Sequence, residues 1–325
     1  MKRFPLDIFN SPVSDYAKRM VFFIGLAEAV SYWKCACPPV FRVECGEMSE
    51  DDKAFFKKLW FNGLGEFFYR NGIKTDIDSF VRIDAPEPKN IPQCEDYVSS
   101  GIEIVPVGGG KDSAVTTELL RPFGDKLRFF TVNDQPARTQ CVLAGGYSED
   151  KIIKIYRTID PELLKRNAEG FLNGHTPFSS VVAFISMYAG FIEGADDVIL
   201  SNESSANESN IGGESVNHQY SKSFEFERDF DEFRRRNFPQ SAVYFSLLRP
   251  FCELQIAKQF SQYKQYHSIF RSCNRGSKKN IWCCECPKCL FVAIMLSPFL
   301  PPDELNSIFG CDMLAKTELE TDFDG

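Results

Sequence analysis

Residues 1–95 carry apolar side chains at helical spacing. This periodicity predicts one helix over residues 17–33 and a second over 51–70, where Phe and Trp residues supply the apolar face. Residues 84–92 follow, and their three prolines disfavour both a helix and a central strand. We therefore expect a mainly helical N-terminal unit that ends in a linker near residue 95.

A different pattern begins at residue 96, where short apolar runs alternate with amphipathic segments. Such alternation with short connections indicates βαβ units, and therefore an α/β fold with a parallel sheet in a second domain, residues 96–325. Ligands in such sheets bind beyond the carboxyl ends of the strands. Strands are expected over 102–107, 127–132, 151–156 and 198–201, and helices over 112–121, 135–146, 161–168 and 178–191.

The last third of the chain is more mixed. Residues 202–236 are polar, and we expect an irregular segment there, of a length that is often functional. A helix is expected over 244–263, followed by a cysteine-rich segment over 273–289. Residues 315–325 are typical of a frayed acidic tail.

Composition narrows the classes of function. A charged fraction of 25% and an apolar fraction of 43% are typical of a globular protein, and 31 Phe residues predict an aromatic core. The net charge of −8 argues against attraction to nucleic acid or to an anionic membrane. No apolar run approaches the roughly 20 residues that a transmembrane helix needs, and no signal-peptide core is visible. We therefore expect a cytoplasmic protein.

A glycine-rich loop leaves the first expected strand and leads into a helix. Glycines let the backbone approach a ligand closely, and the N-terminus of the following helix favours an anion. Lys111 adds positive charge, Asp112 can hold Mg²⁺ or cap the helix, and Ser113 can donate to a phosphate oxygen. We expect a phosphate-binding loop, the alternative being a simple turn capped by Asp112. The loop consists of Gly108, Gly109, Gly110, Lys111, Asp112 and Ser113.

This loop lacks the spacing of the Walker and dinucleotide-binding motifs. It resembles instead the pyrophosphate-binding loop (PP-loop) of the N-type ATP pyrophosphatases, Ser-Gly-Gly-x-Asp-Ser, with Gly108 in place of the first serine. The resemblance implies a PP-loop fold that binds ATP and cleaves it to AMP and diphosphate, while the missing serine removes one hydroxyl donor. Asn133 and Asp134, just past the second strand, lie where such relatives bind adenosine.

Four cysteines follow the spacing C-x9-C-x2-C-x2-C. Four thiolates around one ion make a closed tetrahedral zinc site, so we expect structural Zn²⁺. An iron–sulfur cluster and a group of metal-free thiols are the alternatives, and Cys284 is an additional nearby thiol. The spacing is similar to that of the zinc site in the 7-cyano-7-deazaguanine synthases, which are also PP-loop enzymes. The four residues are Cys273, Cys283, Cys286 and Cys289.

Longer strings of residues resemble one particular family, the ATP-dependent UDP-N-acetylmuramoyl-L-alanyl-L-glutamate epimerases (MurL). The resemblance covers most of the chain. The strings that carry it are GLAEAVSYWK at 25–34, GLGEF at 63–67, NGHTPFS at 173–179, SNESSAN at 201–207, VNHQYSKS at 216–223 and YFSLLRP at 244–250.

The resemblance implies a reaction on UDP-N-acetylmuramoyl-L-alanyl-L-glutamate, a precursor of peptidoglycan. ATP and water are consumed, AMP and diphosphate leave, and the terminal L-glutamate is inverted to D. A proton α to a free carboxylate is very weakly acidic, and each pKa unit of difficulty costs about 1.4 kcal/mol. Adenylation of the α-carboxylate removes its charge, so the α-proton becomes more acidic and the enolate can form.

Roles for individual residues follow as expectations. His218, Tyr220 and Lys222 are the candidates for proton transfer, and in an extended chain His218 and Lys222 would share one face. Lys222 can alternatively stabilise the enolate or bind a carboxylate, and Glu203 can bind Mg²⁺ or act as a second base. Arg249 can clamp a carboxylate or the UDP phosphates. His175 and Asn202 are further substrate-binding candidates.

Two other classes of function stay open at this point. One is another PP-loop enzyme, which thiolates tRNA or builds a nitrile from a carboxylate; the acidic net charge argues against the tRNA substrate. The other is a non-catalytic nucleotide sensor or structural zinc protein. The absence of a serine at Gly108 favours this class, and the presence of Lys111, Asp112 and Ser113 argues against it.

Overall fold

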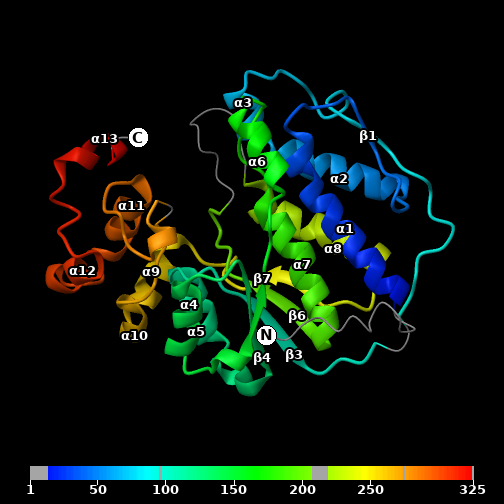
Figure 1. The fold of residues 1–325 in the computed structure, drawn as a ribbon. Coiled ribbons are helices and arrows are strands. Elements are labelled where there is room, and N and C mark those ends of the chain that lie inside the picture. Colours follow the sequence, from blue (N-terminus) through cyan, green and yellow to red (C-terminus); the bar gives the residue numbers. More distant parts are fainter. Residues whose placement is uncertain (1–13, 95–96, 207–218, 274, 324–325) are drawn as a thin grey trace. The chain divides into compact units, whose positions relative to one another are not determined.

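The computed structural model describes residues 14–94, 97–206, 219–273 and 275–323 (Figure 1). The chain forms two compact units, each of which consists of three segments that are separate in the sequence. The first unit comprises Met1–Ile102, Arg157–Val198 and Ala206–Phe245, and the second comprises Glu103–Tyr156, Ile199–Ser205 and Ser246–Gly325. The domain boundary expected near residue 95 stays a prediction.

The first unit is mainly helical, and its helices α1, α2, α7 and α8 lie together in Figure 1. Two short strands, β1 and β2, pair in parallel beside them. The elements are α1 (Ser14–Trp33), β1 (Val40–Arg42), α2 (Glu50–Gly63), α3 (Gly65–Arg70), β2 (Arg82–Asp84), α6 (Pro161–Ala168), α7 (Phe178–Glu193), the 3₁₀ turn η4 (Tyr220–Lys222) and α8 (Phe224–Asn237).

Aromatic rings from these four helices form the core of the first unit, as the composition predicts. The rings of Phe23 and Phe233 lie 4.8 Å apart between centroids, and those of Phe56 and Phe184 lie 5.5 Å apart. All four side chains are fully buried. Because each ring comes from a different helix, this cluster joins α1, α2, α7 and α8 into one body.

A five-stranded sheet confirms the expected parallel α/β fold. Its strand order is β5-β4-β3-β6-β7, and the β3–β4 and β4–β5 pairs run parallel. The order reverses between the neighbouring strands β3 and β6, which is the place where open α/β sheets bind ligands. The assignment to the PP-loop fold stays a prediction. The strands are β3 (Ile102–Pro106), β4 (Leu127–Val132), β5 (Ile152–Ile155), β6 (Ala195–Leu200) and β7 (Val243–Ser246).

The helices of the second unit connect these strands or follow the last of them. Helices α4 and α5 come after β3 and β4, as the strand–helix alternation predicts, and α9 begins shortly after β7. The helices are α4 (Lys111–Leu119), α5 (Pro136–Ala144), α9 (Glu253–Ser261), α10 (Lys264–His267), α11 (Pro287–Leu296), α12 (Pro302–Phe309) and α13 (Glu320–Phe323).

Four expectations about individual elements are wrong. The tail expected to be frayed over 315–325 contains the 3₁₀ turn η6 (Thr317–Leu319) and α13, and Leu319 is buried. The helix expected over 51–70 is two helices separated at Leu64, where φ of −104° and ψ of 9° leave the helical range. The glycine before it, Gly63, has no room for a side chain, since a Cβ there would lie 2.5 Å from the Pro177 ring. The segment 224–237 is α8 and not irregular. Residues 244–263 are not one helix, since β7, a turn and α9 share that range.

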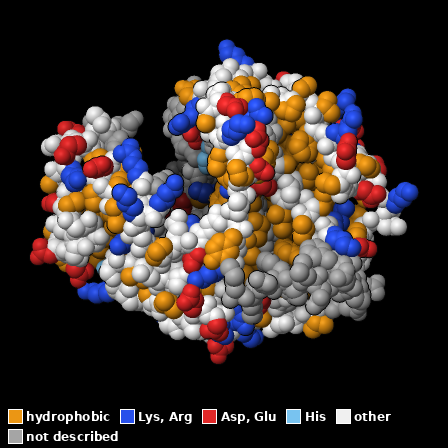
Figure 2. Space-filling model, in the orientation of Figure 1, with side chains coloured by type: hydrophobic (Ala, Val, Ile, Leu, Met, Phe, Trp, Pro, Cys, Tyr) orange, Lys and Arg blue, Asp and Glu red, His pale blue; other side chains and the backbone are white. Residues whose placement is uncertain are grey.

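None of the helices in the described part of the chain has both the length and the apolarity to cross a bilayer. The face drawn in Figure 2 carries both acidic and basic side chains. This mixture agrees with the modest excess of acidic residues in the sequence.

Candidate functional site

The glycine loop connects β3 to α4, as the sequence predicts. Gly109 has a φ of +81°, and a Cβ there would lie 3.1 Å from backbone atoms of Ala137 and Arg138, so no other residue fits without strain. Gly108 is different, because a Cβ there would meet only the Ser113 Oγ, at 3.6 Å. The Gly108 N–H donates to that Oγ at 2.9 Å, which closes the loop over the first turn of α4.

Lys111 is the first residue of α4 and is almost completely buried, with 3% of its side chain exposed. Its Nζ lies 2.5 Å from Asp112 Oδ1 and 2.8 Å from Glu253 Oε2. Burial alone would lower the pKa of Lys111, but the two carboxylates outweigh burial and raise it. The site therefore holds a permanent positive charge beside the glycine loop.

Glu253 is a site residue that the sequence analysis missed. It is the first residue of α9, and burial raises the pKa of its carboxyl group, Lys111 opposes this effect, and the carboxylates of Asp112 and Glu203 add to the rise. Two carboxylates therefore contact Lys111, and a third, Glu203, acts on Glu253. No local motif marks Glu253, because it lies 142 residues from Lys111 in the chain.

A cavity of about 280 Å³ opens beside this ion pair. It is polar on the side of the glycine loop and partly apolar on the side of α11, where Lys288 contributes a second positive charge. Its lining residues are Lys111, Asp112, Glu253, Ser272, Pro287, Lys288, Phe291 and Val292. Two lysines and two carboxylates thus face the cavity, a set that suits an anionic group together with a cation.

The four predicted cysteines come together in the second unit, with all four Sγ atoms within 4.8 Å of one another. The Sγ separations are 4.0 Å for Cys273–Cys286, 3.8 Å for Cys283–Cys289 and 3.5 Å for Cys286–Cys289. A tetrahedral zinc ion with Zn–S bonds of about 2.3 Å needs sulfur atoms about 3.8 Å apart. The residues therefore fit one such ion.

The backbone also prepares this cluster for a metal. The N–H groups of Gly276 and Cys283 point at Cys273 Sγ from 3.1 Å and 3.4 Å. Burial alone would raise the pKa of Cys273, but these donors, together with the thiols of Cys283 and Cys289, outweigh burial and lower it to about 7. Donors to a sulfur favour its thiolate form, which is the form that binds metal.

Backbone contacts connect the cysteine cluster to the glycine loop. The Arg271 N–H donates to the Gly109 carbonyl at 2.8 Å, and Ser272 Oγ lies 2.7 Å from where a Cβ on Gly110 would stand. Cys273 follows directly in the chain. The cluster therefore fixes the position of one wall of the loop.

The predicted residues after β6 also face this end of the sheet. The Glu203 carboxylate accepts hydrogen bonds from Ser205, from the N–H at 2.5 Å and from Oγ at 2.7 Å. Arg249 Nη1 donates to the Glu203 carbonyl at 2.8 Å, and Asn202 Nδ2 donates to Ser246 Oγ at 3.0 Å. Arg249 and Asn202 thus hold the backbone that presents Glu203.

Asn133 and Asp134 follow β4, on the same edge of the sheet. Asn133 adopts a positive φ of 52°, and its N–H donates to the Ile155 carbonyl at 2.8 Å. The Asp134 carboxylate accepts from Thr139 Oγ1 at 2.8 Å and lies 2.9 Å from Lys154 Nζ. Both residues are therefore held in a fixed turn beside the glycine-loop strand.

Of the proton-transfer candidates, Tyr220 and Lys222 belong to the first unit, and His218 lies outside the described residues. Tyr220 and Lys222 form the 3₁₀ turn η4, so the extended chain that would align alternate residues does not occur there. The Tyr220 hydroxyl is buried and donates to the Asp229 carboxylate. Burial and this carboxylate raise the pKa of Tyr220 strongly, which does not favour it as a base.

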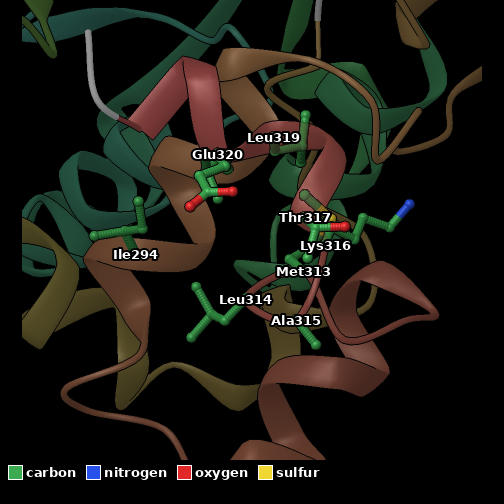
Figure 3. A pocket seen from close by; sticks show the side chains of 9 residues that line it. Ile294, Met313, Leu314, Ala315, Lys316, Thr317, Leu319 and Glu320 are labelled. Carbon is green, nitrogen blue, oxygen red and sulfur yellow. The ribbon is translucent and has the colours of Figure 1, made fainter.

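The last predicted residue, His175, lies in the segment before α7 and is exposed. It lines a second cavity, of about 320 Å³, which lies within the first unit. A third cavity, of about 350 Å³, is lined by α11 and residues 313–320 (Figure 3). Its lining is mainly apolar and includes none of the predicted site residues.

A comparison with known protein families matches two domains of one family. Residues 3–247 match the MurL N-terminal domain, and residues 269–325 match the MurL C-terminal domain. The chain belongs to the MurL family. Its glycine loop and its cysteine cluster therefore lie in a MurL-family protein.

Several curated MurL-family relatives align with nearly the whole chain, and each is named UDP-N-acetyl-alpha-D-muramoyl-L-alanyl-L-glutamate epimerase. The protein from Xanthomonas oryzae pv. oryzae is 35% identical over 319 residues, which are 96% of this chain and 69% of that protein. The protein from Micromonospora sp. is 33% identical over 304 residues, 91% of this chain and 66% of that protein. The protein from Salinispora tropica is 32% identical over 320 residues, 95% and 69% of the two chains.

Proposed function

We propose that this MurL-family protein inverts the terminal L-glutamate of UDP-N-acetylmuramoyl-L-alanyl-L-glutamate to D-glutamate, at the expense of ATP. The observation that carries the proposal is the family match over most of the chain, together with relatives at 32–35% identity that bear the name of this epimerase. The product belongs to the synthesis of peptidoglycan precursors, which takes place in the cytoplasm.

The buried charge at the glycine loop supports the dependence on ATP. Backbone N–H groups at the start of α4 and the Lys111 ammonium group suit the phosphates of a nucleotide. Asp112, Glu203 and Glu253 offer the carboxylate oxygens that Mg²⁺ prefers, and the charges on the phosphates and the ion would redistribute the contacts of Lys111. Asn133 and Asp134 would contact the adenosine.

The chemistry explains why an epimerase needs ATP. An oxygen of the substrate's α-carboxylate attacks the α-phosphorus of ATP, and diphosphate leaves. The resulting acyl-adenylate is neutral at the carbonyl, so a base can remove the α-proton without building a second negative charge on the same centre. A proton is returned on the opposite face, and water then cleaves the anhydride to the D-product and AMP, which makes the cycle irreversible.

The acid and base stay candidates at residue level. His218 has the most suitable ordinary pKa, and Lys222 is the alternative. The buried hydrogen bond of Tyr220 gives it a structural role in η4. Zn²⁺ on the four cysteines would be structural, because four protein ligands leave no open position. An iron–sulfur cluster fits less well, since it places several atoms between its cysteines.

One incubation tests the proposal. The protein is incubated in D₂O with ATP, Mg²⁺ and the L-glutamyl substrate, and the glutamate released by hydrolysis is analysed for α-deuterium and chirality. ATP-dependent formation of α-deuterated D-glutamate is expected, with AMP and diphosphate as co-products. Lys111→Met should abolish it, whereas Lys126→Met, at an exposed lysine of the same unit, should leave it unchanged.

Two results would contradict the proposal. Inversion without ATP would remove the adenylate from the mechanism. No inversion and no exchange in a folded, metal-loaded protein would exclude the epimerase, and a substrate screen for diphosphate release would then look for another reaction of the PP-loop class.

A further inference from the structure

The first unit contains a cavity that the proposed ATP chemistry does not use. Its volume is about 320 Å³. Two of the strings that carry the family resemblance meet there, one at the end of α1 and one just before α7. The lining residues are Ser31, Lys34, Arg157, Ile159, Leu163, Leu164, Asn167, Asn173, Gly174, His175, Thr176 and Phe178.

The lining of the cavity is basic. Three basic residues line it, Lys34, Arg157 and His175, and none of its lining residues is acidic. The Arg157 guanidinium forms a two-pronged ion pair with Glu28, with distances of 2.6 Å and 2.5 Å, and its Cζ lies 5.5 Å from the centre of the Phe178 ring. These two contacts fix its orientation, so the guanidinium is prepared in advance for a ligand.

Lys34 is the unusual member of this set. Lys34 is only 6% exposed, and its Nζ donates to the Gly174 carbonyl. Among the described residues no carboxylate lies within salt-bridge distance of it. A buried ammonium group without a counter-ion is costly. Burial and the nearby Arg157 lower the pKa of Lys34, although Cys35 and Glu28 oppose this, and a bound anion would restore it.

The walls of the cavity are rigid. Pro177 packs closely against Gly63, since a Cβ on Gly63 would lie 2.5 Å from the Pro177 ring. A Cβ on Gly174 would lie 3.1 Å from the Phe67 ring. Asn71 Nδ2 donates to the Asn173 carbonyl at 3.2 Å. The residues that carry the amide and imidazole groups are therefore held in place before any ligand arrives.

We infer that this cavity, the Lys34 pocket, binds an oxyanion of the substrate, with Lys34 and Arg157 as the charged contacts and Asn167 and Asn173 as hydrogen-bonding neighbours. The inference that the anion belongs to the substrate rests on the proposed function. Two parts of that substrate carry oxyanions, the glutamyl carboxylates and the diphosphate. Both suit a cationic pocket with amide donors, and binding experiments with fragments separate them.

Binding is measured on the full chain by calorimetry with two probes, L-alanyl-L-glutamate and UDP, and with ATP as reference. At least one probe should bind, and Lys34→Met should weaken it about tenfold or more while ATP binding is unchanged. Leu164→Trp fills the pocket from an exposed position and should have the same effect without removing a buried charge. It therefore decides the question if Lys34→Met fails to fold.

Two matched variants serve as controls. Lys18→Met removes an exposed lysine from α1, and Leu143→Trp adds a ring at an exposed position of α5; neither should change probe binding. The inference is overturned if neither probe binds at millimolar concentration, or if Leu164→Trp leaves the affinity of the bound probe unchanged. Because binding needs no turnover, probe binding that depends on the pocket in a protein without epimerase activity would contradict the proposed function alone.

Discussion

Gly108 and Gly109 are neighbours, yet they lack a side chain for different reasons. Gly109 has a positive φ and backbone atoms 3.1 Å from the position of a Cβ, whereas Gly108 has room for one. Gly108, which stands where the PP-loop pattern has its first serine, therefore lacks a hydroxyl donor although a side chain would fit there. The sequence could identify the loop, but it could not tell which of its glycines is required.

This difference predicts opposite results for two alanine substitutions. Gly109→Ala should lower the free energy of unfolding by about 1–3 kcal/mol and weaken ATP binding, because a strained residue displaces the loop. Gly108→Ala should change both quantities little. Chemical denaturation and calorimetric titration with ATP measure the two effects. Equal effects of the two substitutions would show that the loop rearranges when the nucleotide binds.

Tyr220 offers a second test at this scale. Tyr220→Phe removes a buried hydrogen bond to the Asp229 carboxylate and should lower the free energy of unfolding by about 1.5–3 kcal/mol. The turnover number should stay close to that of the unmodified protein, as for Tyr69→Phe at an exposed position. A loss of roughly 10²-fold in turnover would instead make Tyr220 a proton-transfer group.

Among elements, the connection between the cysteine segment and the glycine loop has a measurable consequence. Loss of the metal should free the segment around Arg271 and with it the wall of the loop at Gly109. Cys286→Ser should therefore abolish metal binding and weaken ATP binding about tenfold or more. Metal analysis and calorimetry check this.

Cys45→Ser, at an exposed cysteine, is the matched control and should change neither quantity. Undiminished ATP affinity in the metal-free Cys286→Ser protein would disprove the coupling between the two elements.

Local pattern was sufficient for several elements with a clear periodicity. Residues 127–132 and 161–168 form the strand and helix that periodicity predicts. Helix α8 was missed because its first residues are rich in charge, and only the spacing of Phe226, Phe230 and Phe233 indicated a buried face. Gly63 shows the opposite limit, since the residue that leaves no room for a side chain there, Pro177, is remote in sequence.

For the whole molecule, the large number of Phe residues has a structural reason in the core of the first unit. Phe233→Ala should lower the free energy of unfolding by about 3–5 kcal/mol, because the ring is fully buried among rings from three other helices. Phe224→Ala on the same helix removes a ring that is 64% exposed and should change stability by no more than about 0.5 kcal/mol. Thermal and chemical denaturation of both variants measure the difference.

The overall class of fold could be predicted, but the grouping of segments could not. Alternation of strands and helices indicates a parallel sheet, whereas nothing in a local pattern shows that residues 157–198 and 206–245 belong with the N-terminal segment. The same limit applies to the site. Lys111 was predicted from its loop, and its partner Glu253 depends on the order of the strands in the sheet.

The separation of this pair also matters while the protein is being made. Glu253 leaves the ribosome 142 residues after Lys111, which at about 5–20 residues per second corresponds to roughly 7–28 s of synthesis. During that interval the nascent chain carries a lysine without the carboxylate that later covers it, and β6 and β7 are added to the sheet only in the second half of it. The glycine loop is thus among the first parts of the second unit to be translated and among the last to be completed.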